Sequence, residues 1–118
     1  MSVSIITHKG REIVYADYTA CQSQEDIIEV AKRCEAAMID KQNVRCLHNF
    51  IDVTVTTKAL NYGKEAANNT WNDRVTRGAF LGVTGIKKIL LQGFNLVSKI
   101  KWIPFETETE ALDYLAED

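Results

Sequence analysis

Apolar and polar positions follow two different periods along this chain of 118 residues, and the change of period separates the elements it predicts. Runs rich in β-branched and aromatic residues predict five strands, at residues 3–6, 12–18, 44–53, 77–83 and 101–105. Apolar residues three and four positions apart predict four helices, at about 23–38, about 58–72, 86–97 and 108–116. After the first two strands, helices and strands alternate, which is the order of an open α/β sheet.

Several element ends have a recognisable local signal. Gly10 tolerates a positive φ, so the first two strands are expected to form a hairpin. Ser23 opens the first helix with Asp26 three residues later, which is an acidic version of the capping box. Thr107 and Glu110 form a better capping box ahead of the last helix. The strand at 101–105 contains a proline, which cannot donate to a β-ladder, so we expect either an edge strand or a proline at the end of the strand.

The helix at 86–97 is apolar around most of its circumference. The usual stripe is widened by three further apolar residues, Leu91, Phe94 and Leu96. Such a helix is covered on more than one side. We therefore expect it either to sit deep in the protein or to turn its outer face toward a partner or a ligand. That surface would also permit a homodimer, with two copies paired across a two-fold axis.

Composition narrows the classes of function. Hydrophobic residues make up 46% of the chain, charged residues 25%, and the net charge is -2, which is typical of one globular domain. The chain has no basic excess for a nucleic acid and no apolar run of the roughly 20 residues that a membrane-spanning helix needs. We expect neither nucleic-acid binding nor membrane insertion.

The cysteines give no sign of a metal or redox motif. Cys21, Cys34 and Cys46 are odd in number, are widely spaced and form no C-x-x-C pair. Cys34 and Cys46 fall on core-facing positions, where a thiol behaves as a small apolar group. We therefore expect reduced cysteines, a cytoplasmic location, no metal and no cofactor.

Four segments together resemble a known family. They are REIVYADYT (11–19), FIDVTVT (50–56), GAFLGVTGIKKILLQGFN (78–95) and PFETETEALDYL (104–115). They resemble the SpoIIAA-like branch of the STAS superfamily, which is named after sulphate transporters and anti-sigma factor antagonists. The resemblance extends from about Gly10 to Leu115. It implies an α/β fold, with a mixed sheet of four or five strands flanked by about four helices.

The resemblance also implies a function without catalysis. Family members bind protein partners, often through a surface controlled by phosphorylation, and some relatives are thought to bind nucleotides or lipids. In anti-sigma factor antagonists a serine in a D-S-S-G-like turn is the switch, whereas residues 52–60 here read DVTVTTKAL. Thr56 or Thr57 takes the approximate place of that serine. The implied switch or partner surface is Thr56, Thr57, Lys58 and Leu60.

A second candidate surface follows from the order of the elements. If the two middle strands are parallel neighbours, Asp52 and Thr54 would lie near Thr84 and Lys87, beyond the carboxyl ends of the strands. The turn at Gly85 offers free backbone N–H groups at a helix start, where lysines are unfavourable unless an anion is bound. We expect a polar or anionic ligand at these five residues. The alternative is that Thr84 caps the helix and the lysines face solvent.

No catalytic constellation is apparent. Cys46 and His48 alternate onto one face of a strand, as ordinary core or pocket lining, and no motif places a nucleophile beside the histidine. We therefore expect a non-enzymatic, STAS-like regulatory or protein-interaction module. The alternative is a carrier or sensor of a small lipid, nucleotide or other anionic or apolar molecule.

Overall fold

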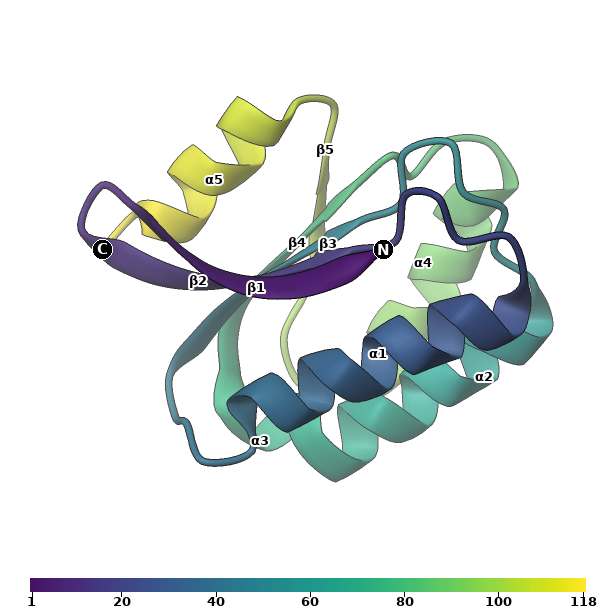
Figure 1. The fold of residues 1–118 in the computed structure, drawn as a ribbon, viewed down its shortest axis with the longest axis horizontal. Coiled ribbons are helices and arrows are strands. Elements are labelled where there is room, and N and C mark those ends of the chain that lie inside the picture. Colours follow the sequence, from purple (N-terminus) through teal and green to yellow (C-terminus); the bar gives the residue numbers. More distant parts are fainter.

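A five-stranded mixed sheet forms the centre of the computed structural model, which describes residues 1–118. The strands lie in the order of the chain, and Figure 1 shows them crossing the middle of the molecule. β1 is antiparallel to β2, and the other neighbours are parallel. The bounds are Ser2–His8 (β1), Arg11–Asp17 (β2), Val44–Asn49 (β3), Val75–Leu81 (β4) and Ile103–Phe105 (β5).

Helices cover both faces of this sheet. The bounds are Gln24–Met38 (α1), Thr57–Ala66 (α2), Ala67–Trp71 (η1, a π-helical segment), Asn72–Arg74 (α3), Ile86–Val97 (α4) and Glu108–Ala116 (α5). α2, η1 and α3 follow one another without a gap, so they form one helix with a π-helical turn inside it. α1, this long helix and α4 lie on one face, which we call the main face, and α5 lies on the other (Figure 1). The α/β fold predicted from the sequence is confirmed.

The local signals explain most of the element ends. Lys9 and Gly10 have positive φ angles of 51° and 80°, and His8 pairs with Arg11, so the expected hairpin closes through a two-residue turn. The Ser23 hydroxyl accepts a hydrogen bond from the Asp26 backbone N–H, at 3.1 Å. The Thr107 hydroxyl accepts one from the Glu110 backbone N–H, at 3.2 Å. Both predicted caps are confirmed.

Alternation along the strands divides the core in two. On β3, Cys46 lies on the main face of the sheet, and Leu47 lies on the opposite face, which α5 covers. The larger core, on the main face, contains the fully buried Trp102. The smaller core lies between the sheet and α5 and includes Leu112.

All five strands differ from their predicted bounds, β1 and β2 by no more than two residues at either end. β3 ends at Asn49 and not at Val53, because the Asn49 side chain accepts a hydrogen bond from the Ile51 N–H and Asp52 then has a φ of 57°. β4 begins at Val75, two residues before the predicted start. β5 is shorter than predicted, and it pairs only with β4, so the expectation of an edge strand is confirmed.

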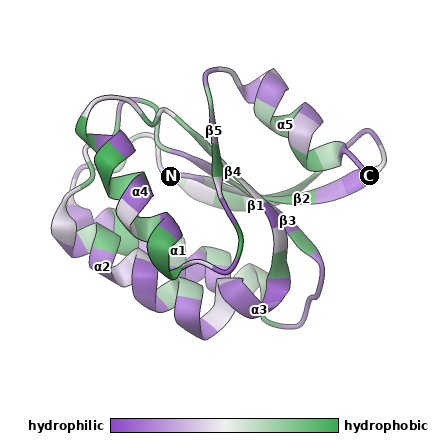
Figure 2. Ribbon diagram, turned by 180° about the vertical axis from the view of Figure 1, so that it is seen from behind, coloured by the Kyte–Doolittle hydropathy of each residue, from purple (hydrophilic) through white to green (hydrophobic).

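The surroundings of α4 resolve one of the alternatives. Phe94 is its single buried residue, so the expectation that this helix sits deep is wrong. Ile86, Ile89 and Leu96 are 70%, 65% and 87% exposed. Figure 2 shows much of α4 in the hydrophobic colour. The outer face of α4 is therefore apolar and open, and a homodimer through it stays a prediction.

Candidate functional site

The loops after β3 and β4 come together as the sequence predicted. The two strands are parallel neighbours, so their carboxyl ends lie at the same edge of the sheet. A Cβ on Gly82 would lie 2.4 Å from the Ile51 backbone nitrogen, so only glycine permits this approach. The Lys87 ammonium crosses between the loops and donates a hydrogen bond to the Phe50 carbonyl, at 3.0 Å.

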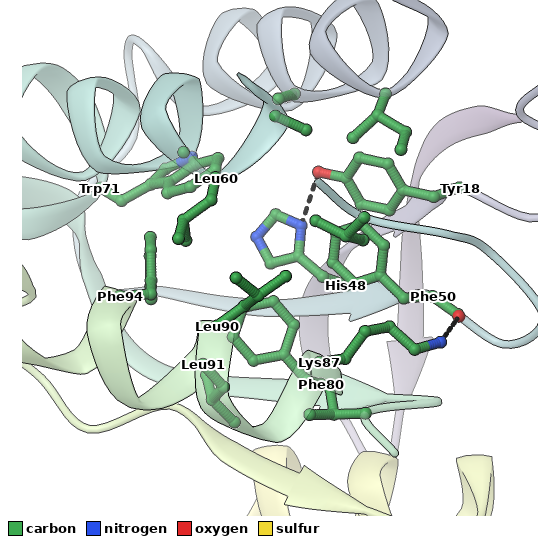
Figure 3. A pocket seen from close by; sticks show the side chains of 16 residues that line it. Tyr18, His48, Phe50, Leu60, Trp71, Phe80, Lys87, Leu90, Leu91 and Phe94 are labelled. Atoms are coloured by element: carbon green, nitrogen blue, oxygen red, sulfur yellow. Dashed lines mark hydrogen bonds between the residues drawn. The ribbon is translucent and has the colours of Figure 1, made fainter. Parts of the chain in front are cut away.

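Behind these loops lies an apolar pocket between α1, α2, α4 and the main face of the sheet (Figure 3). It holds a cavity of about 80 Å³. Thirteen of its sixteen lining residues are hydrophobic, and the others are His48, Gly63 and Lys87. Gly63 in α2 faces Phe94 in α4, and the absence of a side chain there leaves part of the space between the two helices. The sequence did not reveal this pocket, although the excess of apolar residues on α4 was a sign of it.

Aromatic rings form much of the pocket wall. Phe80 and Phe94 meet edge to face with ring centroids 5.9 Å apart. Trp71 comes from the π-helical segment, and its centroid lies 6.1 Å from that of Phe94 and 4.9 Å from that of His48. The Trp71 indole N–H is buried without a hydrogen-bond partner. A buried donor of this kind leaves a hydrogen bond that a bound polar atom could accept.

His48 forms the polar part of the pocket interior. Its side chain is buried, and its Nδ1 lies 2.8 Å from the Tyr18 hydroxyl (Figure 3). Burial lowers the pKa of His48 to about 3, so the imidazole is neutral at ordinary pH. Burial likewise raises the pKa of the Tyr18 hydroxyl. This pair is therefore an uncharged hydrogen-bonded unit.

Lys87 is the only charged residue of the lining. Its pKa is lowered, chiefly because partial burial disfavours the charged form, and the nearby Asp52 carboxylate acts in the opposite direction. No carboxylate oxygen lies within ion-pair distance of its nitrogen. The pocket therefore has one partly desolvated cation with no direct counter-ion.

The other residues of the predicted ligand site stay outside the pocket. Asp52, Thr54, Thr84 and Gly85 are exposed, and they belong to the two rim loops. Gly85, with a φ of 57°, occupies the N-cap position of α4, so the suggestion that Thr84 caps this helix is wrong. Of the five predicted ligand residues, Lys87 alone lines the cavity.

The predicted partner surface lies on the other side of the rim. Thr56 occupies the N-cap position of α2, and its hydroxyl donates to the Gln24 side-chain oxygen at 2.8 Å. Thr57 and Lys58 are exposed at the start of the same helix. Leu60 belongs to both sites, because it lies in the first turn of α2 and lines the pocket.

A membrane-spanning helix is absent, since even the most apolar helix, α4, has only 12 residues. No protein-family model matches the chain, and neither a curated protein nor a solved structure matches it. The function is therefore argued from the chemistry of the site.

Proposed function

We propose that this protein is a non-catalytic binding module that holds a small, mainly apolar ligand carrying a negative group. The observation that supports it is the apolar pocket between α2 and α4, with Lys87 at its rim. Concave, mostly apolar sites with a few polar groups are the usual form of small-molecule sites. We expect the protein in the cytoplasm, where its three cysteines form no disulfide.

Two features of the pocket favour such a ligand. Its aromatic and aliphatic walls suit an apolar body, whose transfer from water contributes about 25 cal/mol per Å² of buried surface. Lys87 suits an anionic group, because a carboxylate or phosphate would replace part of the water that its ammonium has lost. The cavity of about 80 Å³ is small for such a ligand. α4 would therefore move outward on binding, which its single buried residue permits.

The first experiment is native mass spectrometry of the freshly purified protein, which would reveal a co-purifying ligand. The second is titration with octanoate and with octanamide, two molecules of similar shape of which only the first is charged. Binding is followed by the tryptophan fluorescence, since Trp71 lines the pocket. We expect octanoate to bind about 5-fold more tightly than octanamide, the effect of a partly exposed ion pair.

Variants separate the pocket from its rim. Lys87→Ala should remove the preference for octanoate, and Lys88→Ala should keep it, because Lys88 is exposed and does not line the cavity. Gly63→Leu would fill the space opposite Phe94 and should weaken both probes. If Gly63→Leu folds and binds both probes as the wild type does, the pocket is not the site. If the wild type binds the two probes with equal affinity, Lys87 does not bind the negative group of the ligand.

A second candidate is a regulatory module that binds a protein partner, as the resemblance to SpoIIAA-like proteins implies. The exposed positions of Thr56 and Thr57 at the start of α2 favour it. A phosphate at a helix N-terminus is stabilised by the helix dipole. Because Leu60 lies in the same turn and lines the pocket, a movement of this turn would also move the pocket wall. Pull-down from the native cytoplasm with the wild type and the Thr56→Ala/Thr57→Ala variant tests it. Partners that bind both proteins equally would contradict this surface.

A further inference from the structure

Two cysteines and a histidine come together in the core of the main face. Cys34 comes from α1, whereas Cys46 and His48 lie two residues apart on β3 and so share one side of that strand. The exposed fractions of the three residues are 0%, 0% and 1%. The two Sγ atoms and one ring nitrogen of the histidine all lie within 4.8 Å of one another. The sequence placed both cysteines in the core and put Cys46 on the same face of a strand as His48, but it gave no sign that Cys34 joins them.

The distances fit a metal ion with sulfur and nitrogen ligands. Zn–S bonds of about 2.3 Å and Zn–N bonds of about 2.0–2.1 Å at a tetrahedral angle require S···S and S···N separations of about 3.8 and 3.6 Å. The Sγ atoms of Cys34 and Cys46 are 3.7 Å apart, and the Sγ of Cys46 is 3.6 Å from Nε2 of His48. Two edges of the ligand triangle are therefore already of the required length. The third edge, between the Cys34 sulfur and the histidine nitrogen, is within 4.8 Å and would have to shorten by at most about 1.2 Å.

The atoms around the cluster also suit a metal. Tyr18 contacts Nδ1 of His48 at 2.8 Å, which leaves Nε2 directed at the sulfur. A histidine that binds a metal through one ring nitrogen almost always has such a partner on the other. Two thiolates and Zn²⁺ together with a neutral imidazole have no net charge, so the complex can be accommodated in an apolar interior. His48 also lines the pocket, which gives an ion a path to the cluster.

We propose that Cys34, Cys46 and His48 form a binding site for a thiophilic cation, Zn²⁺ or Cu⁺. Thiolate ligands select these ions over the hard cations Mg²⁺ and Ca²⁺. On binding, each thiol releases its proton to solvent as its sulfur–metal bond forms, and Nε2 of His48 donates its lone pair. No further His, Cys, Asp or Glu joins the group. The fourth position of a tetrahedral ion is thus left to water or to a ligand in the pocket.

The test begins with the reduced, full-length protein and one equivalent of Co²⁺, which stands in for Zn²⁺ and absorbs light in tetrahedral thiolate sites. We expect sulfur-to-cobalt charge-transfer absorption in the wild type, its displacement by Zn²⁺, and one Zn²⁺ retained per chain after desalting. Cys34→Ala and Cys46→Ala should weaken Zn²⁺ binding by at least about 100-fold, since the loss of outer partners alone costs 10- to 100-fold. Cys21→Ala is the matched control, because this cysteine lies outside the cluster, and it should bind as the wild type does.

Two measurements on the wild type keep the test independent of whether the variants fold. Zinc X-ray absorption should count two sulfur neighbours and one imidazole nitrogen, and Zn²⁺ should raise the melting temperature until a chelator reverses the effect. A parallel titration with Cu⁺ under anaerobic conditions decides which ion binds more tightly. Absence of the cobalt–thiolate absorption together with no tight Cu⁺ binding would overturn the proposal. So would full Zn²⁺ affinity in a folded Cys34→Ala/Cys46→Ala variant.

Discussion

At the scale of single residues, the tightest constraint is the contact of Gly78 with Trp102. Gly78 lies in β4, and a Cβ built on it would be 2.3 Å from the Trp102 ring. That ring is fully buried and packs on His48 and Phe80, with centroids 5.0 and 5.2 Å apart, so it has no free space into which to move. We expect Gly78→Ala to lower the free energy of unfolding by about 3 kcal/mol, at the upper end of the cost of overpacking. Urea unfolding measures the change.

Gly93→Ala provides the control for that substitution. Gly93 lies inside α4, and the nearest atom to an added Cβ is the flexible Lys64 ammonium, 3.9 Å away. Because alanine is the better helix former, we expect this variant to be more stable by about 0.5–1 kcal/mol. If the two substitutions change the free energy of unfolding equally, the contact with Trp102 is not what excludes a side chain at Gly78.

The pattern of apolar and polar residues predicted the positions of some side chains but not their distant contacts. Alternation put Cys46 and His48 on one side of a strand, and both are buried on the main face. The parallel order of the middle strands put Lys87 near the loop that contains Asp52, and the Lys87 ammonium does reach that loop, at the Phe50 carbonyl. Trp71 could not be placed against His48, since that contact joins residues from separate elements and depends on the π-helical turn. Periodicity specifies a face, but not which distant side chain packs against it.

At the scale of elements, α4 is the least firmly attached helix of the main face. It buries only Phe94, whereas α1, of 15 residues, buries five. Local opening requires little free energy where few apolar side chains are buried. We expect backbone amides of α4 to exchange hydrogen for deuterium faster than those of α1, and octanoate binding to slow the exchange in α4. Hydrogen-exchange mass spectrometry resolves the two helices.

A matched pair of variants tests the same point. Phe94→Ala should speed exchange along α4, whereas Leu96→Ala should not, because Leu96 is 87% exposed. Protection of α4 equal to that of α1 in the free protein would show that the helix does not open. In that case a ligand would need another route into the pocket.

Element bounds were predicted best where a cap or a glycine marks the end. The helices at 86–97 and 108–116 match α4 and α5, because Gly85 and Thr107 hold their N-cap positions. β3 was predicted too long because Phe50 and Val53 continue the apolar pattern beyond the strand. In the structure Val53 belongs to a loop but is still buried in the core. An apolar loop cannot be distinguished from a strand by its pattern.

At the scale of the whole molecule, arginines from three neighbouring strands hold the end of α5 against the sheet. Arg11, Arg45 and Arg77 each donate a hydrogen bond to a backbone carbonyl in the last turn of this helix. Cations at a helix C-terminus are favourable because the dipole is negative there. The start of α5 is held separately, by Tyr15 of β2, whose hydroxyl donates to the Glu108 carboxylate at 2.6 Å. Both ends of the helix thus depend on side chains of the sheet.

The contact of Tyr15 makes the stability of the molecule depend on pH in the alkaline range. Partial burial, and then the hydrogen bond to Glu108, raise the pKa of Tyr15 from 10.0 to about 12. A raised pKa means that the folded state favours the protonated hydroxyl. Its contribution to stability is therefore complete below pH 10 and is lost as the pH rises from about 10 to about 12. Tyr18 and Tyr62 have raised pKa values as well and act in the same direction.

We therefore expect the urea midpoint of the wild type to fall as the pH rises from about 10 to about 12, and the fall to be shallower in Tyr15→Phe. Ultraviolet titration of tyrosinate should show ionisation at higher pH in the folded protein than in urea, because the folded state binds the hydroxyl protons more firmly. Tyr15→Phe also loses the hydrogen bond to Glu108, so it should be less stable than the wild type at pH 8 and approach it as the pH rises. Parallel pH curves for the two proteins would show that Tyr15 titrates alike in the folded and unfolded states, and that its hydroxyl does not couple α5 to the sheet.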